Sequence, residues 1–173
     1  MMSELGYINS LIKMVYDDAL AHSLQGYDKK RAAIMELGNI GDITALPVLF
    51  DAVEDVLLRS AAITAIGKIK FSAENEADAM QAIDVLERVM DNCTEFQYEI
   101  SRTALKNIAE RMRGNNTVTN RIEDVLKKKN EKKDGEAIND AAEFRHIKKA
   151  RDASKQEKGS SKLQNKEDRR LKY

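Results

Sequence analysis

The side chains that most often carry catalysis or bind metal ions are few in this chain and stand apart from one another. His22 and His146 are the two histidines, they lie on different predicted elements, and neither has a second histidine at metal-site spacing. Cys93 is the single cysteine, so no intramolecular disulfide and no cysteine-histidine zinc cluster can form. No cationic residue beside Cys93 in the sequence favours a reactive thiolate. We therefore predict a protein that is not an enzyme, with no catalytic residue, no metal site and no cofactor.

Carboxylates recur on two segments that we expect to be the second helices of neighbouring helical pairs. Such helices present to a partner the side chains that the core does not use. Six carboxylates then form an acidic strip, which is the candidate protein-binding site: Asp51, Glu54, Asp55, Asp84, Glu87 and Asp91. Their mutual repulsion would be relieved by a basic partner, such as a peptide rich in lysine and arginine or the C-terminal region of this chain. An ordinary solvated face explains the same pattern equally well.

Basic residues gather beyond residue 126. Up to that point the chain has 13 Lys and Arg against 20 Asp and Glu, whereas residues 127–173 have 16 against 9. This density suits contacts with the phosphates of RNA. The candidate nucleic-acid-binding residues are Lys127, Lys128, Lys129, Lys132, Lys133, Lys148, Lys149, Arg151, Arg169, Arg170 and Lys172. A solubilising tail is the alternative, and because Phe144 and Tyr173 are its only aromatic residues, we expect no sequence-specific readout.

The composition favours helices. Charged residues make up 34% of the chain and aromatic residues 5%, with one proline and no tryptophan. A length of 173 residues allows one ordinary domain with an appendage. No apolar run approaches the roughly 20 residues that a membrane-spanning helix needs, and the N-terminus lacks the pattern of a signal peptide. We expect a soluble, cytoplasmic protein that does not bind a membrane.

A pattern of small and apolar residues occurs twice at a separation of 29 residues. Ala32-Ala33-Ile34, Leu37-Gly38 and Ile40 return as Ala61-Ala62-Ile63, Ile66-Gly67 and Ile69. A looser third copy, Ala104-Leu105 with Ile108 and Ala109, follows a further 42 residues along the chain. Repeats of this length indicate a stack of helical units, none of which can bury its apolar face alone.

The repeated residues suggest how the units pack. We expect the small residues at positions 32, 33, 61, 62 and 104 to let helices approach closely, with larger residues filling the space between layers. The larger residues are Ile34, Leu37, Ile63, Ile66, Leu105 and Ile108. Gly38 and Gly67 are expected to end the first helix of each pair with a positive φ, and Asp42 to cap the helix that follows.

Residues 27–127 resemble a known family. The segment from Arg31 to Asp42, with Ala45-Leu46-Pro47 and then Leu58-Arg59 through Gly67, is similar to the HEAT-like repeats named after the phycobilisome lyases. The similarity is good over two repeats and weaker from Glu95 to Lys127. The family's valine-arginine pair is Lys29-Lys30 in the first copy, so the resemblance does not extend the family's ladder of buried arginine and aspartate to that repeat.

The helical spacing and the resemblance together predict an all-α fold, a short right-handed α-solenoid of about three HEAT-like hairpins. The apolar spacing predicts an N-terminal capping helix from Ser3 to Gln25, ended by Gly26. Two more helices are predicted from Asn75 to Asn92 and from Thr119 to about Lys129. The predicted division is a capping helix (1–26), a repeat domain (27–129) and a basic, partly helical or disordered tail (130–173).

We interpret the chain as a non-catalytic adaptor that binds a protein partner through its repeats, with the basic tail strengthening binding. The main alternative is a ribosome- or RNA-associated protein whose tail threads along RNA. The family's name adds a third hypothesis, a chromophore-lyase-like subunit. No small-molecule substrate is expected.

Overall fold

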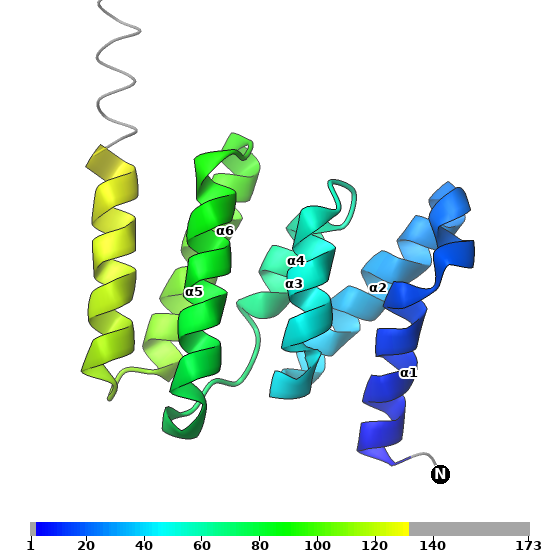
Figure 1. Ribbon diagram of the computed structural model, residues 1–173, viewed down its shortest axis with the longest axis horizontal. Coiled ribbons are helices and arrows are strands. Elements are labelled where there is room, and N and C mark those ends of the chain that lie inside the picture. The colour runs from blue at the N-terminus through cyan, green and yellow to red at the C-terminus, as the bar shows by residue number, and fades with distance from the viewer. Residues whose placement is uncertain (1–2, 132–173) are drawn as a thin grey trace, which may run out of the picture. The chain divides into compact units, whose positions relative to one another are not determined.

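The computed structural model describes residues 3–131, and within this range all regular secondary structure is helical (Figure 1). The helices are α1 (Glu4–Tyr16), α2 (Leu24–Ile40), α3 (Leu46–Glu54), α4 (Arg59–Ile66), α5 (Glu76–Asp91) and α6 (Glu95–Arg111). A further helix spans residues 116–131. Three short 3₁₀ turns, η1 (Asp18–His22), η2 (Ile43–Ala45) and η3 (Ala73–Asn75), lie between them. The predicted all-α class is confirmed.

The helices up to Lys127 belong to one compact unit and form two layers. Helices α1, α3 and α5 make the first layer, and α2, α4 and α6 make the second. In the second layer, α2 packs on α4 and α4 packs on α6. In the first layer, α3 contacts both α1 and α5. The two layers are joined where α1 packs on α2, α3 on α4 and α5 on α6, so consecutive helices alternate between the layers (Figure 1).

The three helices of the second layer run in the same direction. The backbone N–H of Lys70, beyond α4, donates to the carbonyl of Gly41 at the end of α2, at 2.9 Å. Arg111, the last residue of α6, donates from Nη1 to the carbonyl of Gly67 at the end of α4, at 2.6 Å. Because the carboxyl ends of α2, α4 and α6 adjoin, their amino ends share the opposite edge of the unit, which is visible in Figure 1.

The core contains the residues that the repeat pattern predicted. Ile34, Leu37, Ile63, Ile66, Leu105 and Ile108 are each 0–1% exposed. Ala33, Ala61, Ala62 and Ala104 are buried beside them, which confirms that small residues lie where helices meet. Ala32 is exposed, so its predicted role in packing was wrong. The buried face of α2 contains Ala33, Ile34 and Leu37, and the helical rotation of about 100° per residue turns Ala32 away from it.

The role predicted for Gly38 was wrong, and Gly67 ends a helix as predicted but without the predicted positive φ. Gly38 lies inside α2, and Gly67 ends α4 with a φ of −64°. Among the described residues the positive φ belongs to Gly41, at 72°, which ends α2. A Cβ on Gly38 would lie 2.6 Å from Ala65 Cα, and one on Gly67 would lie 2.8 Å from Ala104 Cα. Both glycines are therefore required by close helix packing and not by backbone conformation.

The predicted N-terminal helix is broken in two. Asp17 accepts a hydrogen bond from the backbone N–H of Ala19 at 2.9 Å, and Ser23 accepts one from Gly26 at 3.0 Å. These side chains cap η1 and α2, so α1 ends at Tyr16 and a new helix starts at Leu24. Gly26 therefore lies in the first turns of α2 and does not end a helix, and a Cβ there would lie 1.9 Å from the carbonyl oxygen of Leu20.

Later elements match their predictions more closely. The helix predicted from Asn75 to Asn92 is α5. The last helix begins at residue 116, three residues before Thr119, because Asn115 accepts from the backbone N–H of Val118 and caps it. Asp42 caps η2, a 3₁₀ turn that leads into α3, and does not cap α3 itself. No helix of residues 3–131 is long and apolar enough to cross a membrane.

Candidate protein-binding surface

The acidic strip lies on two adjacent helices of the first layer. Asp51 and Glu54 belong to α3 and Asp55 follows it, while Asp84, Glu87 and Asp91 belong to α5. Helices α3 and α5 contact each other. Asp51, Glu54, Asp84 and Asp91 are exposed, whereas Asp55 and Glu87 are half-buried. The structure thus places the six carboxylates on one layer.

Two arginines of the repeat unit neutralise part of the strip. Arg121 donates to Asp84 Oδ1 at 2.9 Å and to Glu87 Oε2 at 2.6 Å. The hydrogen bond to Glu87 is the main reason that the pKa of Arg121 lies above its ordinary value. Arg88 of α5 donates to Glu54 Oε1 at 2.6 Å and so links α5 to α3. The basic partner expected for the strip is therefore supplied in part by the repeats themselves.

Two further carboxylates accept hydrogen bonds from uncharged groups. The Tyr16 hydroxyl of α1 donates to Asp51 Oδ2 at 2.6 Å, and this hydrogen bond, with burial and the charge of Asp51, raises the pKa of Tyr16 to about 12. Asp55 accepts from the backbone N–H of Leu57 at 2.8 Å. The nearby Asp55 carboxylate also raises the pKa of Tyr27. Asp91 has an interaction of its own as well, so all six carboxylates are engaged within the chain.

Sequence reasoning missed these partners although their spacing is regular. Tyr16 precedes Asp51 by 35 residues, Glu54 precedes Arg88 by 34, and Glu87 precedes Arg121 by 34. These separations join corresponding points on successive helices of the first layer. Donor and carboxylate pairs that recur at one separation close to the repeat length were the available signal.

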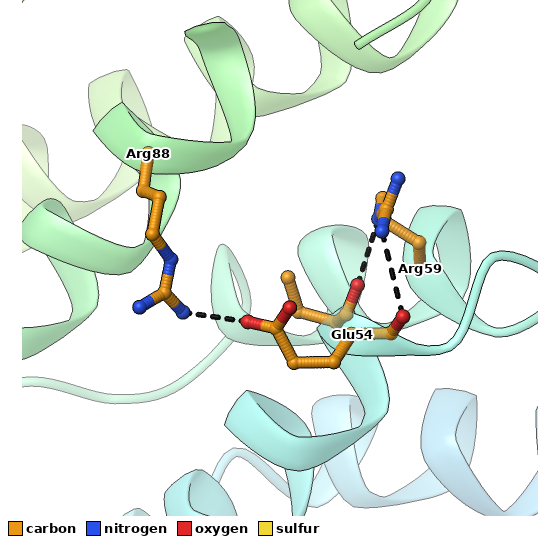
Figure 2. A network of polar contacts seen from close by, with 4 residues as sticks. Glu54, Arg59 and Arg88 are labelled. Atoms are coloured by element: carbon orange, nitrogen blue, oxygen red, sulfur yellow. Dashed lines mark hydrogen bonds and ion pairs between the residues drawn. The ribbon is translucent and has the colours of Figure 1, made fainter. Parts of the chain in front are cut away.

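A small cavity lies where α3 and α5 end and α4 begins. It has a volume of about 180 Å³ and is lined by Val53, Glu54, Arg59, Arg88, Val89 and Asn92. Arg59 donates from Nε to the carbonyl of Val53 at 2.8 Å and from Nη2 to the carbonyl of Glu54 at 3.4 Å. Figure 2 shows Arg59 and Arg88 reaching the end of α3 from opposite sides. Arg59 therefore satisfies carbonyls that the end of α3 leaves without helical partners.

The repeat helices match a known family. The model for HEAT repeats matches residues 18–106, just over half of the chain, and covers η1 and α2 to α5 with most of α6. The chain belongs to the HEAT repeat family. The resemblance seen in the sequence is thereby confirmed. No curated protein matches the chain, and no solved structure does.

The HEAT repeats carry exposed apolar side chains at one edge. Leu24 is the first residue of α2, Val56 and Leu57 precede α4, and Phe96 is the second residue of α6. Their exposed fractions are 83%, 70%, 51% and 66%, respectively. Because the amino ends of α2, α4 and α6 share one edge, these four residues form a row, which we call the apolar edge.

Three of the candidate nucleic-acid-binding residues lie within residues 3–131. Lys127 and Lys128 are exposed, but Lys129 is buried and is not placed for a phosphate contact. Lys129 follows the buried residues Val118, Ile122 and Val125 at helical spacing, which puts it on the apolar face of its helix. The other candidates lie outside the described residues: Lys132, Lys133, Lys148, Lys149, Arg151, Arg169, Arg170 and Lys172.

Within residues 3–131, no group of three or more His, Cys, Asp and Glu side chains is arranged to hold a metal ion. Cys93 is half-buried and packs against the core. His22 is exposed on η1, and His146 lies outside the described residues.

Proposed function

We propose that this HEAT repeat protein is a non-catalytic adaptor that binds another protein through the surface of its repeats. The basic region beyond residue 126 strengthens binding by electrostatic attraction in this proposal. HEAT repeats are commonly protein-interaction scaffolds, and their helical units present extended surfaces to a partner.

The proposed architecture is a short right-handed solenoid of three hairpins. In this proposal the repeats begin at α2, and α1 caps the N-terminal end of the stack. The packing of α2 on α4 on α6, and of α1 on α3 on α5, supports this arrangement. Residues 27–129 act as the binding domain and residues 130–173 as the tail.

The apolar edge is the observation that carries the proposal. A single exposed apolar residue is ordinary on a protein surface. Here four of them lie at or just before the amino ends of three neighbouring helices. With helices about 8–10 Å apart, the row extends over roughly 16–20 Å, which suits a segment of a partner protein.

The acidic strip has a secondary role in this proposal. Its carboxylates already accept hydrogen bonds from side chains of this protein, including Tyr16, Arg88 and Arg121. A binding protein must therefore compete with these side chains. The strip attracts a basic partner at long range and orients its approach, while the apolar edge supplies the buried contact.

The experiment is a capture assay from native lysate with the full chain and a double variant of the apolar edge, Leu57→Asp with Phe96→Asp. Both residues are exposed, so we expect the melting temperature to stay within a few degrees while the protein partner is lost. The matched control is Leu5→Asp, which changes an apolar residue that is 60% exposed at the amino end of α1. Equal capture by the double variant and the wild type would contradict the proposed surface.

RNA binding is the second candidate function. It is favoured by the 16 Lys and Arg against 9 Asp and Glu in residues 127–173. It predicts RNA in the captured material and a binding constant that falls steeply with salt. Replacement of Lys132, Lys133, Lys148 and Lys149 by glutamine would then reduce the slope of that salt dependence.

A further inference from the structure

The cavity at the ends of α3 and α5 has the chemistry of a carboxylate site. Its lining residues include two arginines, Arg59 of α4 and Arg88 of α5, and Asn92, whose side-chain amide is a further hydrogen-bond donor. Glu54 is the carboxylate among the lining residues, and it already accepts a hydrogen bond from Arg88. Figure 2 shows the Glu54 carboxylate pointing toward Arg88, so Glu54 occupies the place that a ligand carboxylate would take.

The contact between Glu54 and Arg88 is easily exchanged. The Arg88 side chain is 65% exposed and that of Glu54 is 64% exposed. An ion pair this open to solvent contributes little to stability, because water screens both charges. Arg88 also reaches Glu54 through one terminal nitrogen, whereas a guanidinium can hold a carboxylate through two parallel hydrogen bonds. A carboxylate from outside therefore replaces Glu54 at small cost.

Arg59 provides a fixed second donor. Its Nε and Nη2 atoms are held by the carbonyls of Val53 and Glu54, which fixes the guanidinium plane. The hydrogen bonds of Arg59 within residues 3–131 use Nε and Nη2, and none uses Nη1. The site thus combines one anchored arginine with one exposed arginine.

The size of the cavity selects a side chain. Its volume of about 180 Å³ falls below the roughly 300–1,000 Å³ of sites that enclose a drug-sized ligand. Val53 and Val89 line it beside the charged groups and can cover the methylene stem of an acidic residue. Val56 and Leu57 of the apolar edge lie in the sequence between Glu54 and Arg59, two residues that line the cavity.

We propose that this cavity binds an aspartate or glutamate side chain of the partner, with Arg59 and Arg88 as the donors and Glu54 as the internal carboxylate that is displaced. The proposal rests on the adaptor function and specifies the chemistry of the bound protein. That protein carries an acidic residue for the cavity and, next to it, apolar residues that cover Leu57. It differs from the acidic strip in the sign of the charge that it recognises.

The test is a titration of the full chain with N-acetyl-glutamate amide, followed by NMR at the Nε–H signals of Arg59 and Arg88 and the side-chain amide of Asn92. N-acetyl-glutamine amide is the neutral control ligand. We expect saturable shifts with the glutamate compound only. Glu54→Gln should lower the dissociation constant roughly two- to fivefold, because a competing exposed ion pair is removed.

Two protein variants complete the design. Arg88→Ala should abolish the shifts without a change in melting temperature, because Arg88 is exposed. Arg113→Ala removes the same charge from an exposed ion pair with Glu110 and should leave the titration unchanged. Shifts that do not saturate, that persist in Arg88→Ala, or that appear equally with the glutamine compound would overturn the proposal. Tighter binding of inorganic phosphate would overturn the assignment to a carboxylate.

The outcome separates this site from the adaptor function. If a protein partner is captured by the full chain while the titration fails, the carboxylate site alone is overturned. If the titration succeeds and Arg88→Ala still captures the partner as well as wild type does, the cavity binds carboxylates but its assignment to the partner is overturned.

Discussion

The two layers of the repeat unit are held together in different ways. In the second layer, α2, α4 and α6 meet through glycine against alanine, with Gly38 on Ala65 and Gly67 on Ala104. In the first layer, α1, α3, α5 and the last helix are linked by polar side chains, of which the pair of Glu54 and Arg88 is one. Tight packing requires one backbone geometry, whereas exposed polar contacts can be exchanged.

The layers also differ in charge. Helices α3 and α5 have seven carboxylates and one arginine, whereas α2, α4 and α6 have five carboxylates and seven lysines and arginines. Helices α3 and α5 therefore present a negative surface to a partner, and α2, α4 and α6 do not. The second layer therefore tolerates little change where its helices touch, whereas the polar contacts between helices of the first layer can vary.

The largest effect is expected from a charge placed inside the second layer. Ala62 is 0% exposed on α4, so Ala62→Glu buries a carboxylate without a partner. The cost is several kcal/mol, about the size of the whole stability of a small domain, and we expect the repeats to unfold. Circular dichroism during heating measures this. Ala32→Glu is the matched control, because Ala32 is exposed, and it should melt close to wild type.

A smaller effect is expected where two helices of the second layer touch. Gly38→Ala puts a Cβ 2.6 Å from Ala65 Cα, which belongs to backbone that cannot rotate away. Overpacking of this kind costs about 1–3 kcal/mol and exceeds the gain of up to ~1 kcal/mol from replacing a helical glycine. Urea denaturation measures the difference. Gly114→Ala meets no atom within 4 Å and should be neutral or slightly stabilising, so equal losses in both variants would refute close packing at Gly38.

The polar links of the first layer should contribute less. Arg121 is 31% exposed and bonds Asp84 and Glu87, so Arg121→Ala should cost about 1 kcal/mol after allowance for solvent screening. Part of this loss should disappear in concentrated salt, which screens the same charges. Urea denaturation at two salt concentrations gives both values. A cost as large as that of Gly38→Ala would contradict the difference between the layers.

The smallest effect concerns the titration of Tyr16. Its bond to Asp51 raises the pKa of the hydroxyl from 10.0 to about 12, so the neutral, donating form persists in the folded protein above the pH at which an unfolded tyrosine ionises. The contribution of this bond to stability is therefore complete below about pH 10 and is lost as the pH rises through about 12. NMR of the tyrosine rings follows this titration. Asp51→Asn should return Tyr16 to an ordinary pKa, and an unchanged midpoint would show that the bond is absent in solution.

Much of the second layer could be predicted from the sequence. The displacement by 29 residues identified Ala33, Ile34, Ala62 and Ile63 as buried, because a buried helix face leaves a periodic record in the chain. The meaning of Gly38 and Gly67 could not be derived, since a glycine that permits close packing and one that permits a positive φ look alike in sequence. The break between α1 and α2 depends on Asp17 and Ser23, whose capping bonds are local and carry no periodicity.

The candidate site was only partly predictable. The carboxylates of α3 and α5 were found, since they lie on the polar faces of predicted helices. Their partners were not found, because Arg88 and Arg121 are 34 residues from Glu54 and Glu87 and meet them only after the helices stack. The cavity beside Arg59 could not be predicted for the same reason, since the ends of three helices must meet to form it.

The most direct test of the central claim is capture from native lysate at two salt concentrations, with the full chain and a chain that ends at Lys127, and with both protein and RNA identified. If the repeats bind the protein partner, one protein is retained by both chains, more weakly without the basic region, and remains bound at high salt. RNA or ribosomes retained only by the full chain and lost at high salt would contradict this claim.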